Sequence, residues 1–484
     1  MRALYITQEY APLFAEGGLG VTAGSLPAAL DDGHDFQHDI IVPYYPWLVR
    51  RLGLQTQKLC DLPARTVARV TSDASVHRLL DHGGSCEILL LRADAWYERS
   101  GIYRDEFYLP FQDEVERAAF FGWCVAEWAA SGKRTYDIVH GTDWQSATAL
   151  AHLRERLPRL PQVFSIFNAH YRGELAGKET SSLGLPPRQL VQLLDSAGPR
   201  PSLLLAGLQA ADAAVTCSVG YAAELSVPSD SDPLVAALRR TGIKGIQLGV
   251  DEELWDPRAH GRASLPFTAA TADQGKQANK LALQKHLSLA QDVSLPVVGV
   301  CSRLVPEKGT DLLLEALAPL LGQGRLQLVL IGPAVGPIRS LLAGLAAEGA
   351  KRHIAHLRSY DQTAAWLAFA GADLTVMPSR VEPGGLNQLI AYRYGTFPVV
   401  SPVGGLRDTV VDIREDPTRG TGFVIPEHTA RSVRETVVSA LDWLGGNAHE
   451  VSRARRRVMA LDWSWARTAR RYAEVYTDVT ARSS

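Results

Sequence analysis

Charged side chains gather around two loops in the second half of the sequence. Arg303 and Lys308 lie in "CSRLVPEKG", directly after a short apolar run, and Glu382 precedes the glycine pair of "VEPGGLNQL". If that glycine pair opens a helix, its free amides and the two cations can bind a diphosphate, while the carboxylate holds sugar hydroxyls. Surface salt bridges use the same residue types, so the loop context carries this interpretation.

A third loop, near the start of the chain, has a different composition. The stretch "AEGGLG", residues 15–20, follows the apolar run "RALYIT" and precedes "VTAGSLPAAL". Glycine turns between a strand and a helix often seat phosphates, but this one lacks both the full dinucleotide-binding spacing and a Walker lysine. A simple tight turn is an equally good interpretation. Any positive charge for a phosphate here must come from another loop.

The elements that would position these loops alternate along the chain. Short apolar runs typical of buried strands, such as "HDIIVP", "CEILLLR", "PVVGVCSR" and "LQLVLIG", are separated by segments with helical spacing. This alternation predicts parallel sheets built from βαβ units. The stretch 256–280 is rich in Ala, Pro, Gly, Thr and Asp and predicts a crossing between domains 1–255 and 256–460. Residues 461–484 are predicted to form a helix that packs back on the body.

Composition excludes several classes of protein. With 484 residues, 46% hydrophobic, 21% charged and a net charge of -2, the chain is typical of a globular protein without general attraction to nucleic acid or anionic membranes. Its five cysteines are widely spaced, which favours free thiols in a reducing compartment. No run of 18 apolar residues is present, so we expect a cytoplasmic protein with no membrane partner. No cluster has metal-ligand spacing, so no metal is expected.

Motifs along nearly the whole chain resemble those of the bacterial glycogen and starch synthases, glycosyltransferase family 5. They include "DIVHGTDWQSATAL", "KQANKLALQKHLSL", "GVCSRLVPEKGTDLLLEAL", "PSRVEPGGLNQLIAYRYGT" and "GGLRDTV". The resemblance implies a retaining transferase with the α/β GT-B fold, in which two Rossmann-like domains with parallel sheets face each other across a deep cleft. It also implies a nucleoside diphosphate-activated donor and no other cofactor.

The resemblance implies roles for matching residues of the second half. Arg303 and Lys308 would bind the donor diphosphate and stabilise the departing charge. Glu382 would hold hydroxyls of the transferred sugar, and Tyr360 would stack on the base. These roles make Arg303, Lys308 and Glu382 the expected catalytic residues.

Backbone groups are also implied in donor binding. Gly385, Leu386 and Asn387 fall where the family's amides meet the distal phosphate. Gly17 and Gly18 would allow the first domain to approach the diphosphate when the cleft closes, since glycine has no side chain to obstruct that approach.

Departures from the family pattern cluster in the first half. The family lysine of "KTGGL" is replaced by Ala15, "HDWH" becomes "TDWQ", and "HN" becomes Phe167-Asn168. Each lost partner of a buried hydroxyl costs about 1 to 3 kcal/mol. A changed ring or acceptor explains this pattern, as does a loss of catalysis, but the retained Arg303, Lys308 and Glu382 argue against loss.

Candidate residues for the transferred ring or the acceptor lie near these departures. His170 is a candidate replacement for the lost histidine, although a polar loop histidine without a role is at least as good an interpretation. Asp143 follows a predicted strand, a place that suits a polar contact with the sugar or the acceptor. An aspartate that only caps the next helix would occupy the same place. The candidates are Asp143, Trp144, Phe167, Asn168 and His170.

We therefore expect a transferase that moves a sugar or cyclitol from a nucleoside diphosphate to a small acceptor. The favoured hypothesis is a pseudoglycosyltransferase similar to those of aminocyclitol (acarbose-type) biosynthesis, because a carbocyclic donor has no ring oxygen and does not need residues tuned to glucose. One alternative is an α-1,4-glucan (glycogen) synthase that uses ADP- or UDP-glucose. Another is an inactive paralogue that binds nucleotide sugars. The base, the ring, the acceptor and the oligomeric state stay open.

Overall fold

The computed structural model describes residues 1–484 except 107–108, 198–199, 228–231, 262–263, 348–351 and 484. The chain forms two compact units. The first contains Met1–Leu248 and Trp465–Ser484, and the second contains Gly249–Ser464. The chain thus leaves the first unit once and returns to it with its last helix.

The first unit is built on a nine-stranded sheet in the order β3-β4-β5-β2-β1-β6-β7-β8-β9. Neighbouring strands from β5 to β9 in this order are parallel, whereas β3 and β4 form an antiparallel hairpin on one edge. The central strands are short and apolar, so they are buried on both faces. The strands are β1 (Arg2–Ile6), β2 (Gln37–Pro43), β3 (Thr56–Val67), β4 (Val70–Leu79), β5 (Glu87–Arg92), β6 (Ile138–Thr142), β7 (Gln162–Ile166), β8 (Ala213–Thr216) and β9 (Lys244–Gly245).

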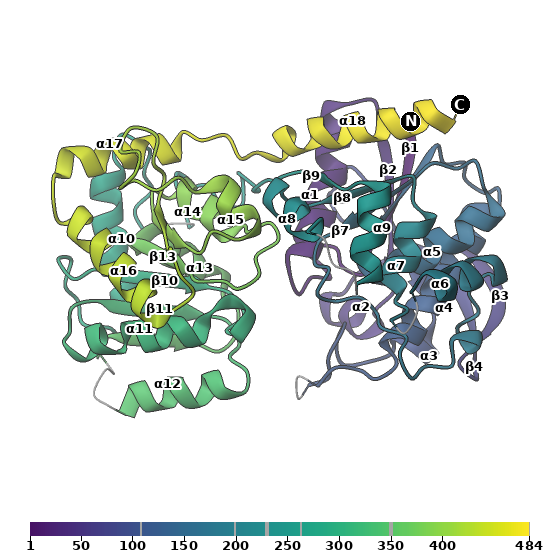
Figure 1. Cartoon of the computed structure of the whole chain (residues 1–484), viewed down its shortest axis with the longest axis horizontal. Helices are drawn as coiled ribbons and strands as arrows, with labels where there is room; N and C mark the ends of the chain where they lie inside the picture. The colour runs from purple at the N-terminus through teal and green to yellow at the C-terminus, as the bar shows by residue number, and fades with distance from the viewer. Residues whose placement is uncertain (107–108, 198–199, 228–231, 262–263, 348–351, 484) are drawn as a thin grey trace. The chain divides into compact units, whose positions relative to one another are not determined.

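Helices connect these strands and cover the sheet on both faces (Figure 1). They include α1 (Gly18–Gly33), α2 (Pro46–Leu52), α3 (Asp94–Tyr97), α4 (Glu114–Ala130), α5 (Asp143–Arg156), the 3-10 turn η1 (Thr180–Leu183), α6 (Pro187–Ala197), α7 (Leu203–Ala210), α8 (Val219–Leu225) and α9 (Pro233–Thr241).

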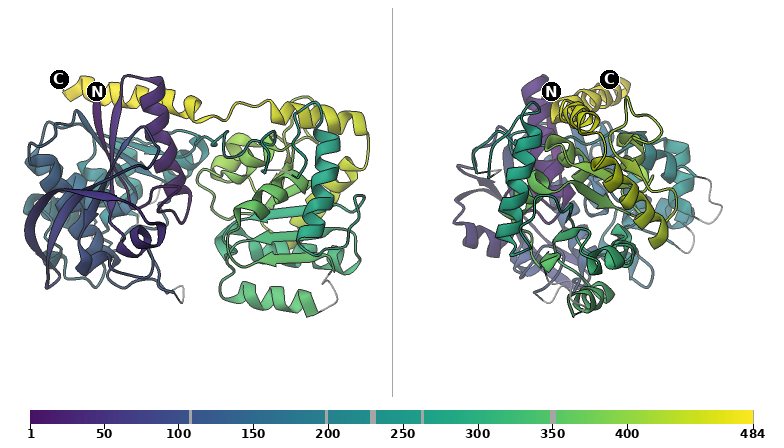
Figure 2. Two further views of the ribbon diagram at one scale, coloured as in Figure 1. Left: turned by 180° about the vertical axis from the view of Figure 1, so that it is seen from behind. Right: turned by 90° about the vertical axis from the view of Figure 1, so that its left-hand side faces the viewer.

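The last helix, α18 (Trp465–Ser483), packs against α1 of the first unit, near the N-terminal strand (Figure 2). Buried polar groups bind it there. The Tyr476 hydroxyl lies 2.7 Å from His140 Nδ1, and the Tyr472 hydroxyl lies 3.3 Å from Ser165 Oγ. These hydrogen bonds satisfy polar groups that would otherwise be buried without partners, so they specify where the helix docks.

The second unit contains a six-stranded parallel sheet in the order β12-β11-β10-β13-β14-β15. Its strands are β10 (Val297–Cys301), β11 (Gln327–Ile331), β12 (Ile354–Leu357), β13 (Leu374–Met377), β14 (Phe397–Val400) and β15 (Phe423–Val424). Its helices are α10 (Ala272–His286), the 3-10 turn η2 (Pro306–Lys308), α11 (Thr310–Gly322), α12 (Pro337–Ala347), α13 (Gln362–Gly371), α14 (Asn387–Arg393), α15 (Gly404–Thr409), α16 (Ala430–Leu444) and α17 (Ala448–Met459).

The division between the units falls between Leu248 and Gly249, earlier than the predicted boundary after residue 255. Val250 belongs to the core of the second unit, and its N–H donates to the Trp463 carbonyl at 2.8 Å. The predicted crossing, 256–280, includes the start of α10, where the buried ammonium of Lys276 donates to Thr396 Oγ1 at 2.6 Å. These contacts bind the stretch to the second unit.

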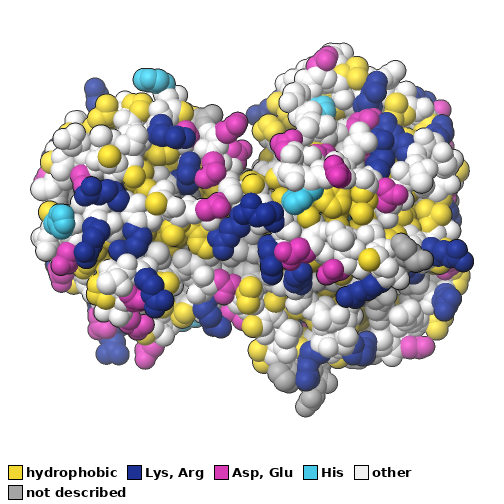
Figure 3. All heavy atoms as spheres, turned by 90° about the horizontal axis from the view of Figure 1, so that it is seen from above, with side chains coloured by type: hydrophobic (Ala, Val, Ile, Leu, Met, Phe, Trp, Pro, Cys, Tyr) yellow, Lys and Arg dark blue, Asp and Glu magenta, His cyan; other side chains and the backbone are white. Residues whose placement is uncertain are grey.

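Two further features are the distribution of surface charge and the length and polarity of the helices. On the face drawn in Figure 3, Lys and Arg side chains are interspersed with Asp and Glu. Among the described residues, every helix is too short or too polar to cross a membrane.

Candidate functional site

Two of the predicted catalytic side chains meet in the second unit. Lys308 ends η2, and its Nζ donates to Glu382 Oε1 at 2.6 Å. The other carboxylate oxygen accepts a hydrogen bond from Ser379 Oγ at 2.9 Å. Glu382 is only 7% exposed, and a buried carboxylate needs a partner charge. The Lys308 ammonium provides that charge.

Gly309 explains why the two loops approach so closely. Its φ of +67° lies in the left-handed region, and a Cβ at this position would stand 1.9 Å from the Pro378 carbonyl oxygen. Only glycine fits both constraints. The turn after β10 therefore packs directly on the loop after β13 and brings Lys308 to Glu382.

The glycine turn before α14 is braced from several sides. Gly385 has a φ of +63°, and its carbonyl accepts a hydrogen bond from Gln388 Nε2 at 2.9 Å. Asn387 Nδ2 donates to the Cys301 carbonyl at 2.6 Å, and the Gly405 N–H donates to the Glu382 carbonyl at 3.1 Å. The turn Gly385–Asn387 thus has a fixed backbone beside the Lys308–Glu382 pair, as an amide-based phosphate site requires.

Arg303 and Tyr360 lie outside this hydrogen-bonded group. Both are exposed, with the Tyr360 side chain 57% exposed and its hydroxyl donating to Gln362 Oε1 at 3.0 Å. Among the described residues the Arg303 guanidinium has no hydrogen bond or ion pair. An exposed cation and an exposed aromatic ring are available to a ligand, but the structure does not bring them into contact with Lys308.

In the first unit the glycine turn is held by an acid that the sequence analysis missed. Glu9 Oε2 accepts the N–H groups of Glu16 at 2.7 Å and Gly17 at 3.0 Å, and Glu9 Oε1 accepts the Tyr103 hydroxyl at 2.8 Å. Burial raises the pKa of Glu9. The Gly17 amide is therefore engaged within the protein, while Gly18 is exposed with open space around it. The sequence feature that points to Glu9 is an acidic residue at the end of an apolar run, in "TQEYAP".

Asp143 is not a helix N-cap, which was one of the two interpretations of this residue. Thr142 occupies the N-cap, and Asp143 begins α5 with a φ of +51°, which is unusual for a residue with a side chain. Its Oδ1 accepts the N–H groups of Phe167 at 2.8 Å and Asn168 at 3.3 Å. Burial raises the pKa of Asp143 to about 7, and the nearby Glu9 charge adds to this, against the lowering effect of the two hydrogen bonds.

The other first-unit candidates divide into buried and exposed residues. Trp144 is buried, and its ring packs on Gly173, where a Cβ would stand 2.4 Å away. Phe167 is 9% exposed, whereas His170 is exposed. The Asn168 side-chain oxygen accepts the His170 N–H at 3.0 Å. The structure therefore gathers Asp143, Phe167 and Asn168, and attaches His170 through its backbone.

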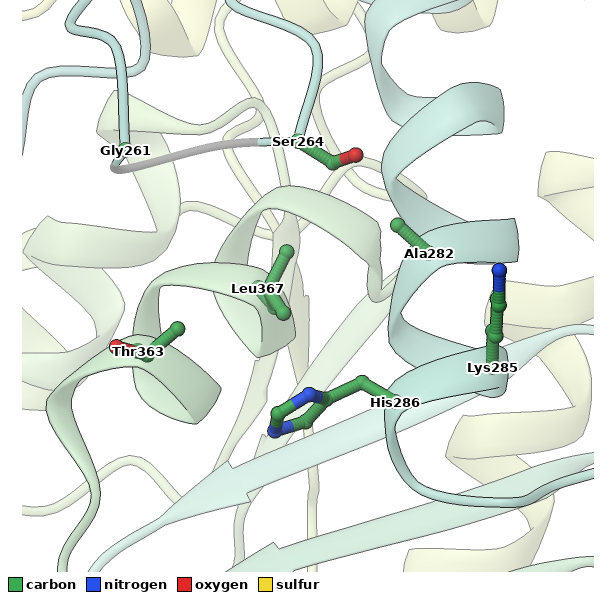
Figure 4. Close-up of a pocket in the computed structure, with 7 residues that line it drawn as sticks. All are labelled: Gly261, Ser264, Ala282, Lys285, His286, Thr363 and Leu367. Atoms are coloured by element: carbon green, nitrogen blue, oxygen red, sulfur yellow. The ribbon is translucent and has the colours of Figure 1, made fainter.

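A cavity of about 520 Å³ in the second unit lies apart from these residues. Lys285 and His286 at the end of α10 line it, together with Thr363 and Leu367 of α13, and the imidazole of His286 extends toward α13 (Figure 4). None of the predicted site residues lines it. Within the described part of the chain, no three His, Cys, Asp or Glu side chains are grouped so that they could hold a metal ion.

Comparison with known proteins places this geometry in a family. The model of the starch synthase catalytic domain matches residues 2–240, and that of glycosyl transferases group 1 matches residues 285–448. A glycogen synthase of Geotalea daltonii is 34% identical over 100% of this chain and 99% of its own. Glycogen synthase 2 of Geobacter sulfurreducens is 35% identical, with 98% of each chain covered.

A solved structure agrees with these sequence matches. The catalytic domain of starch synthase IV from Arabidopsis thaliana, bound to ADP and acarbose, matches with a TM-score of 0.88 and 27% identity over 99% of each chain. This similarity confirms the predicted two-domain α/β architecture of the GT-B type. The chain belongs to the glycogen and starch synthase family, glycosyltransferase family 5, and is a glycosyltransferase.

Proposed function

We propose that this chain transfers a ring, with retention, from a nucleoside diphosphate donor bound by the loops after β10 and β13. The observation that carries this proposal is the 2.6 Å contact of Lys308 with Glu382 beside the braced turn Gly385–Asn387. It unites a cation for the diphosphate, backbone amides for a phosphate and an acceptor for hydroxyl groups.

In this proposal the second-unit residues act on the leaving group. Negative charge grows on the diphosphate as its bond to the ring breaks, and the Lys308 ammonium and Arg303 guanidinium stabilise that charge. Glu382 orients the Lys308 ammonium and accepts hydrogen bonds from ring hydroxyls. The acceptor attacks from the side that the diphosphate leaves, and a phosphate oxygen takes the acceptor proton, so no protein nucleophile is needed.

The first-unit residues are proposed to bind the ring or the acceptor. Asp143 begins α5 beside the backbone of Phe167 and Asn168, and its pKa of about 7 lets it carry a proton near neutral pH. A protonated carboxyl can donate a hydrogen bond as well as accept one, which suits hydroxyl recognition. Tyr360, with its exposed ring, is the proposed base-stacking residue.

The comparisons favour α-1,4-glucan synthesis from ADP- or UDP-glucose as the specific reaction. Relatives at 33–35% identity that span 98–99% of their own lengths are named glycogen synthases. The starch synthase neighbour was solved with ADP and acarbose. Glycogen or another α-glucan is then the acceptor.

A second candidate, transfer of a cyclitol or another changed ring to a small acceptor, is favoured by the first unit. The Phe167 N–H donates to the Asp143 carboxylate, but the Phe167 side chain has no group that can bind a hydroxyl. Ala15 is exposed and contributes no charge. A carbocyclic donor with an allylic cation would not need either lost group. This is the pseudoglycosyltransferase hypothesis.

A turnover panel separates the candidates. The purified full chain is incubated with ADP-, UDP-, GDP- and dTDP-glucose and with GDP-valienol, each with glycogen or an amino-sugar acceptor, and released nucleotide is measured. Elongation of glycogen would support the glucan synthase and exclude the second candidate. Product from the cyclitol donor alone would support the second. Tight nucleotide binding without turnover of any donor would contradict both and indicate an inactive paralogue.

A further inference from the structure

Arg380 lies in the loop after β13, two residues before Glu382, and its side chain extends to the helix that follows Lys308. Its Nη1 and Nη2 donate to the two carboxylate oxygens of Asp311, each at 2.7 Å. Asp311 lies in the first turn of α11, just after the Gly309 turn. The planar guanidinium therefore forms a two-pronged contact with this helix, which we call the Arg380–Asp311 fork.

The same arginine also binds the turn that carries Lys308. Arg380 Nη1 donates to the Pro306 carbonyl, and the Arg380 N–H donates to the Glu307 carbonyl at 2.8 Å. Pro306 and Glu307 are the first two residues of η2, and Lys308 is its last residue. Arg380 therefore holds the backbone on both sides of Lys308.

The orientation of η2 depends on contacts of this kind. A 3-10 turn of three residues has few and poorly aligned internal hydrogen bonds, so contacts from outside decide which way it faces. The Lys308–Glu382 contact is one hydrogen bond at the end of a flexible lysine stem. A bidentate pair between a guanidinium and a carboxylate fixes both distance and angle. The Arg380–Asp311 fork is therefore the firmer restraint on this turn.

The exposure of the fork separates this role from a role in folding. The Arg380 and Asp311 side chains are 39% and 36% exposed. Hydrogen bonds from Arg380 lower the pKa of Asp311, so the carboxylate is charged at neutral pH. Ion pairs with this exposure contribute little to the free energy of unfolding, because water screens them. Loss of the fork should therefore move the turn more than it destabilises the unit.

We propose that Arg380 is a positioning residue for the leaving-group cation. Its fork onto Asp311 holds η2 so that the Lys308 ammonium reaches both Glu382 and the donor diphosphate, an inference that rests on the proposed function. When the bond from the ring carbon to the diphosphate oxygen breaks, its electron pair goes to that oxygen, and an ammonium already in place stabilises the new charge best. A displacement of about 1 Å can lower a rate about 100-fold.

The first test measures the geometry without any transfer reaction. The full chain is treated with a limiting amount of acetic anhydride, and acetylation of Lys308 is measured by mass spectrometry relative to exposed Lys285. A lysine held against a carboxylate is protonated and protected, so a looser turn makes it more reactive. Arg380→Lys keeps the charge but loses the fork, and we expect it to speed Lys308 acetylation by about threefold or more.

Arg414→Lys is the matched control, because Arg414 is bonded much as Arg380 is. It forms a bidentate contact with Asp412, its Nη2 also donates to the Val424 carbonyl, and its side chain is 37% exposed. These partners lie outside the loops after β10 and β13. Arg414→Lys should leave both Lys308 acetylation and kcat unchanged. Urea unfolding of every variant checks that each one folds.

The second test measures turnover with the donor found in the panel. We expect Arg380→Lys to lower kcat about tenfold and to change the donor KM by less than about threefold. The same substitution in a chain that carries Lys308→Ala should lower kcat no further, because Arg380 acts through Lys308. Asp311→Asn, which breaks the other half of the fork, should match Arg380→Lys.

The two tests decide separate claims. Unchanged Lys308 acetylation in Arg380→Lys, faster acetylation with an unchanged kcat, or an equal loss of kcat in the wild-type and Lys308→Ala chains would overturn the positioning role. If the wild-type chain turns over no donor in the panel, the proposed function fails, and acetylation alone then decides whether Arg380 holds Lys308. If Arg380→Lys does not fold, Asp311→Asn takes its place in both tests.

Discussion

The two candidate regions differ in what their charged side chains contact. In the second unit, Lys308 and Glu382 form an ion pair with each other, and Arg303 is exposed. In the first unit, Glu9 and Asp143 are hydrogen-bonded to backbone amides, and burial raises the pKa of each. The second unit therefore presents charge suited to a leaving diphosphate, whereas the first uses acids to hold loop backbones in place.

Under the proposed function, this contrast explains why the departures from the family pattern cluster in the first half of the chain. A cation that stabilises a diphosphate does the same work whichever ring is transferred, so Arg303 and Lys308 can stay while the ring changes. Side chains that contact the ring are specific to it. We propose that Phe167 lies in the region where a change of substrate is accommodated.

The largest effect is expected from Lys308→Ala. It removes the proposed cation for the leaving group and leaves the buried Glu382 carboxylate without its ammonium partner, so we expect kcat to fall about 10²- to 10³-fold. Nucleotide release from the donor found in the panel measures it. Lys285→Ala, at an exposed lysine of the same unit, is the control. A loss below tenfold would remove the functional contrast between the two regions.

A smaller effect is expected from Asp143→Asn, on the pH dependence of stability. The folded pKa of Asp143, about 7, lies above its unfolded value of about 3.9, so its contribution is fully present below pH 4 and is lost as pH rises through 7. We expect this loss to be on the order of 2 kcal/mol, below the full linkage value because the side chain is partly exposed. The asparagine keeps an oxygen for the Phe167 and Asn168 amides.

Urea unfolding from pH 4 to pH 8 measures this effect. The free energy of unfolding of the wild type should fall relative to the variant as pH rises. Asp73→Asn, at an exposed aspartate of β4, should follow the wild type. Parallel curves for wild type and Asp143→Asn would show that this carboxyl titrates normally.

The smallest effect is expected from restoring family residues in the first unit. If glucose is the poorly bound ring, Ala15→Lys with Phe167→His should raise glycogen elongation about tenfold, since each supplies a lost polar partner. Ala15→Gln with Phe167→Leu, which has similar size but no charge and no imidazole, is the control. An unchanged rate would place the difference at the acceptor instead.

Local patterns in the sequence predicted the parts of the molecule that depend on neighbouring residues. Short apolar runs predicted the parallel strands, because a strand buried on both faces needs a continuous apolar segment. The "VPEKG" and "VEPGGLNQL" loops predicted one site with two cations and a carboxylate beside them, because parallel strands place the loops that follow them at one edge of the sheet. The structure brings Lys308 to Glu382, whereas Arg303 lies outside that contact.

Tertiary structure alone decided the contacts between distant residues. Glu9 meets Tyr103, His140 meets Tyr476, and Arg65 meets Trp123 and Gly184, at separations that no local pattern records. The pKa of Asp143 likewise depends on its burial and on the charge of Glu9 rather than on its own segment. The sequence by itself determined which loops carry charge. Only folding determined whether each charge faces another side chain, a backbone amide or solvent, because those environments are assembled from chain segments far apart in sequence.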